Sequence, residues 1–288
     1  MLGFILLQWE RAGAAAVRVF EILDEEPSIS DPDDPVPLGP IEGRVEFDNV
    51  RFTYPAGEGD AVLDGLSFTI EAGETIALVG ATGSGKSTIA RLLPRFYDVD
   101  SGSVRVDGHD VRTLKVTELR TAVSQVTDDP FLFATSVHNN VAFARPDCDD
   151  ATVSAAIDDA AATDFVADLP LGVETEIGER GLTLSGGQRQ RLAIARTLVA
   201  DPVVLVLDDA TSAIDVAVEE RIHNALERRR ANRTTILIAH RLSTIALADR
   251  VILIEDGKVS ASGRHHDLLA SNARYAAILA DATNDGDR

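Results

Sequence analysis

The stretch GATGSGKST, residues 80–88, combines glycines with a lysine and hydroxyl side chains at a spacing that suits phosphate binding. Gly80 and the run Gly85 to Ser87 fit the pattern G-x-x-x-x-G-K-[ST]. In this pattern the glycines let backbone N–H groups turn toward phosphate oxygens, the lysine reaches the outer phosphates, and the serine hydroxyl ligates Mg²⁺. The predicted nucleotide contacts are Gly80, Ala81, Thr82, Gly83, Ser84, Gly85, Lys86, Ser87 and Thr88.

A second candidate lies at the end of the apolar run VVLVLDD, residues 203–209. A carboxylate at the C-terminal end of a buried strand is well placed to hold Mg²⁺. The sequence therefore predicts Ser87 and Asp208 as metal ligands, with Asp209 beside them. Because TIALV precedes the glycine-rich loop and IARLL follows it, strand, loop and helix come in the order that the motif requires. A chance glycine-rich turn does not explain that order.

Short β-branched runs separated by helical segments predict the elements that position these residues. Such alternation indicates a parallel sheet covered by helices, hence an α/β protein. Residues 149–167 are rich in alanine without a strand pattern, which predicts a helical insertion. The expected strand segments are 43–54, 65–70, 75–80, 103–108, 122–126, 203–207, 234–239 and 250–263.

The first 26 residues open with an apolar run that Gln8, Glu10 and Arg11 interrupt, and they carry apolar side chains at helical spacing from Leu2 to Leu23. The apolar run is too short to span a bilayer, which needs ~20 apolar residues. It predicts either an amphipathic helix packed on the domain or the cytoplasmic end of a membrane helix. The next segment, 27–43, is rich in proline and acidic residues and is expected to be a linker.

The net charge and the cysteine count limit the classes of function and the cellular compartment that the sequence favours. The chain has 288 residues, 27 basic and 47 acidic side chains, and a formal net charge of −20. This balance argues against a general affinity for nucleic acid, which depends on lysine and arginine clusters. The single cysteine, Cys148, excludes an internal disulfide and favours a reducing compartment such as the cytosol.

The run LSGGQRQRLAIARTLVADP, residues 184–202, resembles the signature sequence of ATP-binding cassette (ABC) ATPases. Its opening residues place a hydroxyl, backbone N–H groups and a helix N-terminus against a phosphate. In the family, that phosphate belongs to ATP held by the other cassette, so two cassettes enclose two nucleotides. The resemblance implies ATP and Mg²⁺ as cofactors, and a nucleotide contact by each of Ser185, Gly186, Gly187 and Gln188.

The resemblance extends from about Arg44 to the tail and implies the domain organisation. The expected fold is a P-loop NTPase cassette with a mixed or parallel sheet core, an N-terminal antiparallel β subdomain and a helical subdomain. Residues 1–26 are interpreted as the cytoplasmic end of the last transmembrane helix with a connecting helix, and 27–43 as the linker. The nucleotide-binding domain is expected at 44–283, with its helical subdomain at about 134–198, and a polar tail at 284–288.

The resemblance also assigns roles outside the two motifs. Tyr54 is expected to stack on adenine, the loop ending in Asp215 to touch the opposite cassette, and His240 to sense the γ-phosphate. The segment EIGERG, residues 176–181, is expected to contact the coupling helices of transmembrane domains.

Two departures from the family pattern concern the attacking water. Asp209 stands where the family has a catalytic glutamate, and the lost methylene draws the carboxylate back by roughly 1.5 Å, where about 1 Å of misplacement can cost ~10²-fold in rate. Asp128 stands where the family has a glutamine that touches Mg²⁺ and the water, although Gln125, three residues upstream, is an alternative. Ionised, Asp128 can still ligate a metal but donates no hydrogen bond. The predicted catalytic residues are Asp209, His240 and Asp128, with Asp128 also a metal ligand.

This pattern resembles one member of a heterodimeric exporter. Its own site would bind ATP and hydrolyse it slowly, and its intact signature would complete a partner's site. The implied partners are a second, different cassette and the transmembrane domains of an N-terminal membrane region, with the cassette at the cytoplasmic face of the cell membrane and no nucleic acid. The alternatives are a homodimeric exporter ATPase that uses Asp209 as base and, less favoured, a soluble ABC ATPase acting on nucleic acid or ribosomes.

Overall fold

The computed structural model describes residues 2–55, 59–178, 181, 183–228, 233–238 and 241–285. They divide into two compact units, Met1–Ser30 and Asp31–Arg288. The first unit is built on helix α1, Leu2–Leu23, which buries none of its own residues. None of the described helices combines the length and the apolar character that a membrane span needs.

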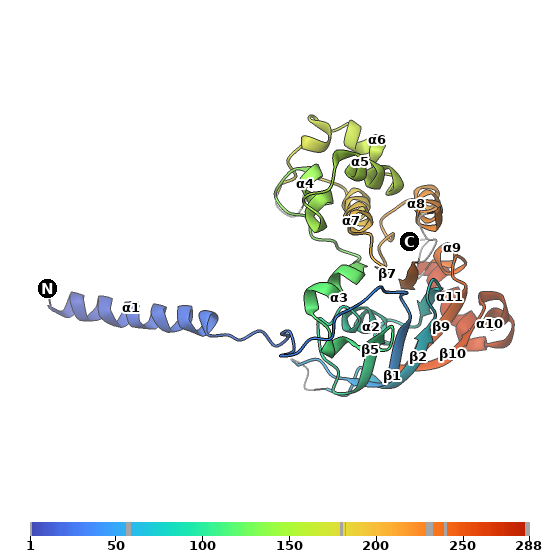
Figure 1. Cartoon of the computed structure of the whole chain (residues 1–288), viewed down its shortest axis with the longest axis horizontal. Coiled ribbons are helices and arrows are strands. Elements are labelled where there is room, and N and C mark those ends of the chain that lie inside the picture. The colour runs from blue at the N-terminus through green and yellow to red at the C-terminus, as the bar shows by residue number, and fades with distance from the viewer. Residues whose placement is uncertain are drawn as a thin grey trace. The chain divides into compact units, whose positions relative to one another are not determined.

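The second unit contains the strands and the remaining helices (Figure 1). Its strands are β1 Val45–Phe52, β2 Leu63–Ile70, β3 Thr75–Val79, β4 Ser101–Val106, β5 His109–Asp110, β6 Val123–Val126, β7 Val204–Asp208, β8 Thr234–Ile238, β9 Arg250–Glu255 and β10 Lys258–Gly263. Its α-helices are α2 Lys86–Leu92, α3 Val116–Ala122, α4 Val137–Val141, α5 Asp150–Asp159, α6 Thr163–Ala167, α7 Gly186–Ala200, α8 Val216–Arg228, α9 Leu242–Ile245, α10 His265–Ser271 and α11 Ala273–Asp285. Short 3₁₀ turns lie at Val111–Thr113, Ala142–Ala144 and Gly172–Glu174.

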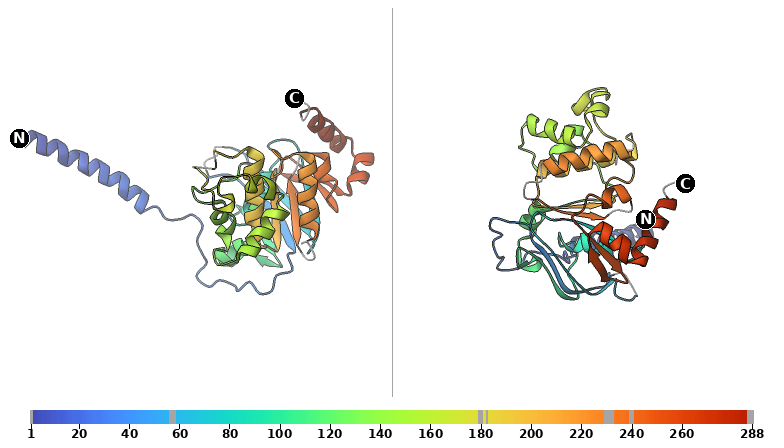
Figure 2. Two further views of the ribbon diagram at one scale, coloured as in Figure 1. Left: turned by 90° about the horizontal axis from the view of Figure 1, so that it is seen from above. Right: turned by 90° about the vertical axis from the view of Figure 1, so that its right-hand side faces the viewer.

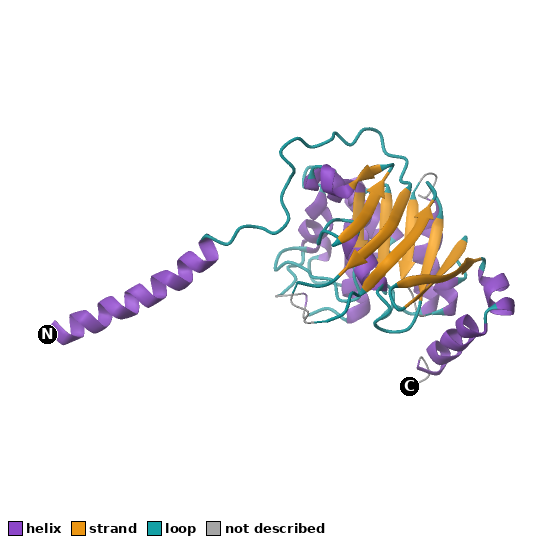
Figure 3. Cartoon of the chain, turned by 90° about the horizontal axis from the view of Figure 1, so that it is seen from below, coloured by secondary structure: helices purple, strands orange, loops and turns teal. Residues whose placement is uncertain are grey.

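A six-stranded sheet of order β10-β9-β3-β8-β7-β6 forms the centre of this unit. Its strands run parallel except β10, which forms an antiparallel hairpin with β9. A second sheet, of order β2-β1-β4-β5, is antiparallel. These two sheets confirm the predicted fold class, a cassette with a mostly parallel core and an antiparallel β part. Figure 3 shows the strands side by side, with most helices of this unit behind them.

The central strands are mostly apolar, as is usual for parallel strands that are buried on both faces. In β3, Ala77 and Val79 belong to one core with α5, α7 and α8, whereas Ile76 and Leu78 belong to a second core with α2, α3 and the antiparallel sheet. The helices α4 to α7 come between β6 and β7 in the chain and gather on one side of the strands (Figures 1 and 2). The helices expected between 149 and 167 are α5 and α6.

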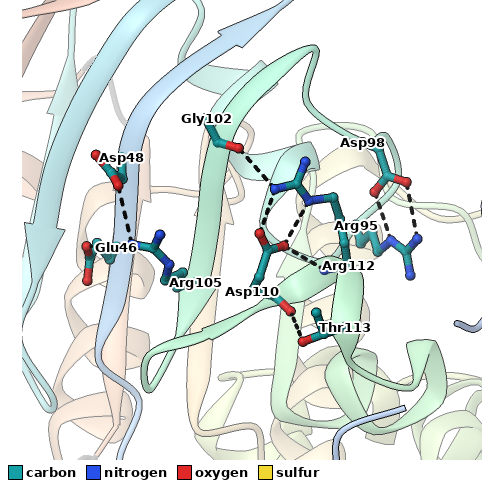
Figure 4. Close-up of polar contacts among 9 residues, drawn as sticks. All are labelled: Glu46, Asp48, Arg95, Asp98, Gly102, Arg105, Asp110, Arg112 and Thr113. Carbon is teal, nitrogen blue, oxygen red and sulfur yellow. Dashed lines mark hydrogen bonds and ion pairs between the residues drawn. The ribbon is translucent and has the colours of Figure 1, made fainter. Parts of the chain in front are cut away.

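Surface ion pairs brace the antiparallel sheet (Figure 4). The Arg105 guanidinium on β4 lies 3.0 Å from a Glu46 oxygen and 3.4 Å from an Asp48 oxygen, both on the neighbouring β1. Arg112 pairs with Asp110 at 2.6 Å. Such partly exposed pairs contribute roughly 0–1 kcal/mol each, so the two apolar cores account for most of the stability.

Residues 31–43 have no helix or extended strand, as expected of a proline-rich segment, but they are fixed to the cassette. The Asp107 carboxylate, in the turn after β4, accepts hydrogen bonds from the backbone N–H groups of Glu42, Gly43 and Arg44 at 2.7–3.1 Å. Because a charged acceptor holds three successive amides, the end of this segment enters β1 in a defined direction.

Candidate functional site

The glycine-rich loop joins the C-terminal end of β3 to the N-terminal end of α2. Gly80 lies so close to β9 that a Cβ there would stand 2.2 Å from the backbone oxygen of Ile254. Gly85, directly before α2, has φ of 104°. Only glycine fits the close backbone approach at position 80, and only glycine adopts the conformation at position 85 without strain. These two requirements explain the glycines of the loop.

Lys86 is almost fully buried, with an exposed fraction of 6%. Its Nζ donates hydrogen bonds to the backbone oxygens of Gly80, at 2.7 Å, and Ala81, at 3.0 Å. Burial lowers the pKa of Lys86, while the nearby charges of Asp209 and Asp208 oppose that shift. The cation is therefore held inside the loop, where phosphate oxygens would be its natural additional partners.

Ser87 and Asp208, the two residues predicted to ligate a metal ion, contact each other. Ser87 Oγ donates to Asp208 Oδ1 at 3.1 Å, although 121 residues separate them. Asp208 is 9% exposed, and burial raises the pKa of its carboxyl, with the Ser87 hydrogen bond opposing the rise. A divalent cation would stabilise the ionised carboxylate that burial disfavours, and both oxygens are ligand types that Mg²⁺ prefers. These residues, with Lys86, fit MgATP.

Tyr54 follows β1 and lies against α2. Its hydroxyl is 3.1 Å from Thr88 Oγ1 and accepts a hydrogen bond from Arg91 at 3.2 Å. Its ring packs edge-on against Phe52 and Tyr97, with centroid distances of 4.9 and 5.3 Å. The ring is thus fixed beside the glycine-rich loop, and its stacking on adenine stays a prediction.

The signature residues form the first turn of α7. Ser185 is the N-cap: its Oγ accepts from the backbone N–H of Gln188 at 3.3 Å, and the Gln188 side chain accepts from the backbone N–H of Ser185 at 2.8 Å. This capping box uses a lone pair of the serine oxygen and leaves its proton for another acceptor. Among the described residues, no hydrogen bond or ion pair joins residues 185–188 to residues 80–88.

Close packing is a second reason why residues 186 and 187 are glycines, and the sequence did not reveal it. A Cβ on Gly187 would lie 2.5 Å from the backbone oxygen of Ala213, and one on Gly186 would lie 3.3 Å from the Ala213 Cβ. The start of α7 therefore packs directly on the loop that follows β7.

Asp128 lies two residues beyond β6, and its carboxylate accepts a short hydrogen bond from Ser212 Oγ. Gln190, on α7, donates to the Asp128 backbone oxygen at 2.9 Å. Gln125, the alternative, lies within β6 opposite Val206 of β7, and its side-chain amide is buried with no hydrogen-bond partner among the described residues. By strand alternation it shares a sheet face with Asp208, two residues after Val206.

The other predicted residues lie near the end of β7. Asp209 follows Asp208 directly, with φ of 48°, and its backbone N–H donates to Ile238 at 2.9 Å. Asp215 is exposed and precedes α8. His240 lies outside the described residues, as do Glu179 and Arg180 of the predicted coupling segment.

Two residues that sequence reasoning missed hold the loop after β7. The Arg241 guanidinium donates to the backbone oxygens of Ser212, at 2.7 Å, and Ile214, at 2.8 Å. Glu219, buried on α8, lies 3.4 Å from the Arg241 guanidinium. The residue type and position of Glu219 in the sequence give no sign that its carboxylate is buried. Arg241 directly follows His240, a predicted site residue, and that position was a signal that sequence reasoning could have used.

Comparison with known proteins gives the family. Residues 63–212 match the family model described as ABC transporter. Over 273 residues the chain is 47% identical to an "ATP-dependent lipid A-core flippase" of Alkalilimnicola ehrlichii, and over 272 residues it is 44% identical to "ABC transporter B family member 1" of Arabidopsis thaliana. In each case the match covers 93% of this chain, but it spans only 45% of the bacterial relative and 21% of the plant relative.

A solved structure supports the same assignment. "Structure of a bacterial Atm1-family ABC exporter with ATP bound" matches with a TM-score of 0.89 and 42% identity, over 98% of this chain and 49% of that chain. The family model covers more than half of the present sequence and includes the signature run, residues 184–202, from which the resemblance was inferred. The chain belongs to the ABC transporter family.

Proposed function

We propose that this chain is the nucleotide-binding part of an ABC exporter that works with a second, different cassette. Its own glycine-rich loop binds MgATP and hydrolyses it slowly, and its signature residues complete a faster site on the partner. The two cassettes would lie at the cytoplasmic face of the cell membrane, and their ATP-driven closure would change the conformation of the transmembrane domains. Family membership and the names of the relatives, an ATP-dependent flippase and an exporter with ATP bound, support the exporter part.

Asp209 is the observation that carries the slow-site part. It follows the metal candidate Asp208 directly at the end of β7, and its negative charge opposes the lowering of the Lys86 pKa by burial. Its φ of 48° is a conformation in which aspartate and asparagine are enriched several-fold over other side chains. The local backbone therefore suits aspartate, and the shorter side chain holds its carboxylate farther from an attacking water than glutamate would.

The signature supports action on a partner rather than on this chain's own loop. Its capping box fixes Ser185 in one orientation while the serine proton stays available, and the described contacts of residues 185–188 lie within α7 or with the loop after β7. A phosphate supplied by a second cassette would complete this helix end, because the first amides of a helix attract anions.

Hydrolysis by Asp209→Glu tests the slow site. We expect the 288-residue chain to bind MgATP with little turnover, and Asp209→Glu to raise the steady-state rate about tenfold or more, since about 1 Å of placement is worth ~10²-fold and the strained backbone offsets part of the gain. Lys86→Ala serves as the blank. Wild-type turnover close to that of the glutamate variant would instead favour a homodimeric ATPase that uses Asp209 as base.

Complementation tests whether the signature acts on the partner. In the Asp209→Glu background, chains that carry Lys86→Ala or Ser185→Ala should each be inactive. Mixing the two should restore part of the activity, because the Lys86→Ala chain still offers an intact signature to the intact phosphate loop of the other chain. Mixtures that stay inactive at concentrations where the chains associate would show that Ser185 serves its own chain or no nucleotide at all.

A further inference from the structure

Asp128 contacts the loop that follows β7, not the glycine-rich loop. The Asp128 carboxylate accepts a hydrogen bond from the hydroxyl group of Ser212, which lies 84 residues later in the chain. The described hydrogen bonds of Asp128 all involve Ser212 or Gln190.

Gln190 makes this contact a three-residue network. Its side chain is 2% exposed, and its Nε2 donates to the Asp128 backbone oxygen at 2.9 Å and to Ser212 Oγ at 2.8 Å. Its Oε1 accepts from the backbone N–H of Ala213 at 3.0 Å. Both ends of the glutamine amide are therefore used, and the hydroxyl of Ser212 has the glutamine as donor and the aspartate as acceptor.

The same loop is packed as well as hydrogen-bonded at this point. Gly187 leaves room for the backbone oxygen of Ala213, which a Cβ there would approach to 2.5 Å. The loop from Asp209 to Asp215 is thus held by α7 on one side and by the segment after β6 on another. A charged acceptor makes the hydrogen bond of Asp128 to this loop stronger than a neutral one would be.

We propose that Asp128 is a positioning residue that ties the loop Asp209–Asp215 to the segment after β6 through Ser212, in place of a role as metal ligand. The inference rests on the proposed function in one respect, since that loop carries Asp209 and Asp215. An aspartate here is short enough to accept from Ser212 while its own backbone oxygen accepts from Gln190. This geometry gives the substitution of glutamine by aspartate a structural purpose within one chain.

Amide hydrogen exchange of residues 212–214, measured on the 288-residue chain without nucleotide, tests the link directly. Asp128→Ala and Ser212→Ala should each speed exchange about tenfold. The double variant should be no faster than Ser212→Ala alone, because the Asp128 carboxylate reaches the loop through the Ser212 hydroxyl, which Ser212→Ala removes together with its hydrogen bond from Gln190. Asp128→Asn keeps an oxygen acceptor and should exchange within about threefold of wild type. Asp129→Ala, a change at the exposed neighbouring carboxylate, is the matched control and should have no effect.

The Mg²⁺ dependence of ATP binding separates positioning from ligation. As a positioning residue, Asp128 can be replaced by asparagine without moving the Mg²⁺ midpoint by more than about threefold, whereas loss of a carboxylate ligand would raise it about tenfold or more. Three results would overturn the inference. The effects of Asp128→Ala and Ser212→Ala on the exchange rate could be additive, Asp128→Asn could exchange as fast as Asp128→Ala, or Asp128→Asn could raise the Mg²⁺ midpoint of ATP binding about tenfold. Because exchange needs no nucleotide, it can agree with this inference even if Asp209→Glu gains no activity, in which case the proposed function alone fails.

Discussion

Glu219 is a buried carboxylate whose replacement by glutamine tests how the loop after β7 is stabilised. It is 2% exposed on α8 and accepts hydrogen bonds from Thr211 Oγ1, at 2.8 Å, and from Thr244 Oγ1. The Arg241 guanidinium lies 3.4 Å away and His223 Nε2 3.7 Å away. The carboxylate therefore joins the loop after β7, α8 and α9 in one polar cluster.

The magnitude follows from the pKa of Glu219. Burial alone would raise this pKa, but His223 and the two threonine donors outweigh burial and lower it from 4.5 to about 2. This difference between the unfolded-state and folded-state pKa corresponds to about 3 kcal/mol of folding free energy. Because the folded-state pKa is depressed, this stabilisation is present above about pH 4.5 and is lost as the pH falls toward 2.

Glu219→Gln cannot ionise, so its free energy of unfolding should lack this pH-dependent part. We expect the variant to be about 3 kcal/mol less stable at pH 7, with the difference narrowing to about 2 kcal/mol at pH 3.5. Urea unfolding followed by circular dichroism at several pH values measures both numbers. Glu220→Gln, at the exposed neighbouring position, is the matched control and should change stability by less than about 0.5 kcal/mol.

Two stability curves that run parallel between pH 7 and pH 3.5 would refute this reasoning. Such a result would mean that the carboxylate is no more ionisable in the folded chain than in the unfolded one. The hydrogen bonds from Thr211 and Thr244 would then act as they do on a neutral acceptor.

Three further predictions concern single positions. Gly102→Ala should lower the free energy of unfolding in urea by more than about 3 kcal/mol, because its φ is +80° and a Cβ would lie 2.3 Å from the backbone oxygen of Asn49. The control Gly108→Ala has a similar φ of +82° but open space around the Cβ, and should cost only about 1–2 kcal/mol. Equal losses would contradict the clash. Gln125→Met should raise the stability of the nucleotide-free chain by about 1–3 kcal/mol, since it removes a buried unpaired amide, and a loss of stability would mean that the amide has a partner. Tyr54→Phe should change ATP affinity by less than about threefold and Tyr54→Ala should weaken it about tenfold, if the ring stacks on adenine; equal effects in a fluorescent-nucleotide titration would assign the role to the hydroxyl.

The phosphate loop could be predicted from the sequence because its parts are contiguous. Strand, glycine turn and helix follow one another within residues 75–92, and short-range conformational preferences are enough to place Lys86 and Ser87 at the helix start. The N-cap of α7 is local in the same way, since Ser185 and Gln188 are three residues apart. The position of Asp208 followed from its place at the end of a buried strand.

Asp128 shows where prediction from sequence stopped. Alignment on the run DPFLF placed it beside Mg²⁺ and water, but its hydrogen-bond partners depend on where the loop after β7 lies, and that loop is 84 residues away in the chain. The residues around position 128 do not indicate that Ser212 lies next to Asp128 in the folded chain. His240 stays a prediction, because it lies outside the described residues.

The family, the glycine-rich loop and the signature run could be read from the sequence, because each is written in a short contiguous pattern; the role of Asp209 in place of a glutamate stays a prediction. The three-dimensional fold was needed to see that Asp128 contacts Ser212 and Gln190, that a side chain on Gly187 would clash with Ala213, and that Glu219 is buried. These contacts arise where the order of strands in the sheet brings separate loops to one edge, and a sequence pattern specifies the strands more directly than it specifies how their loops meet.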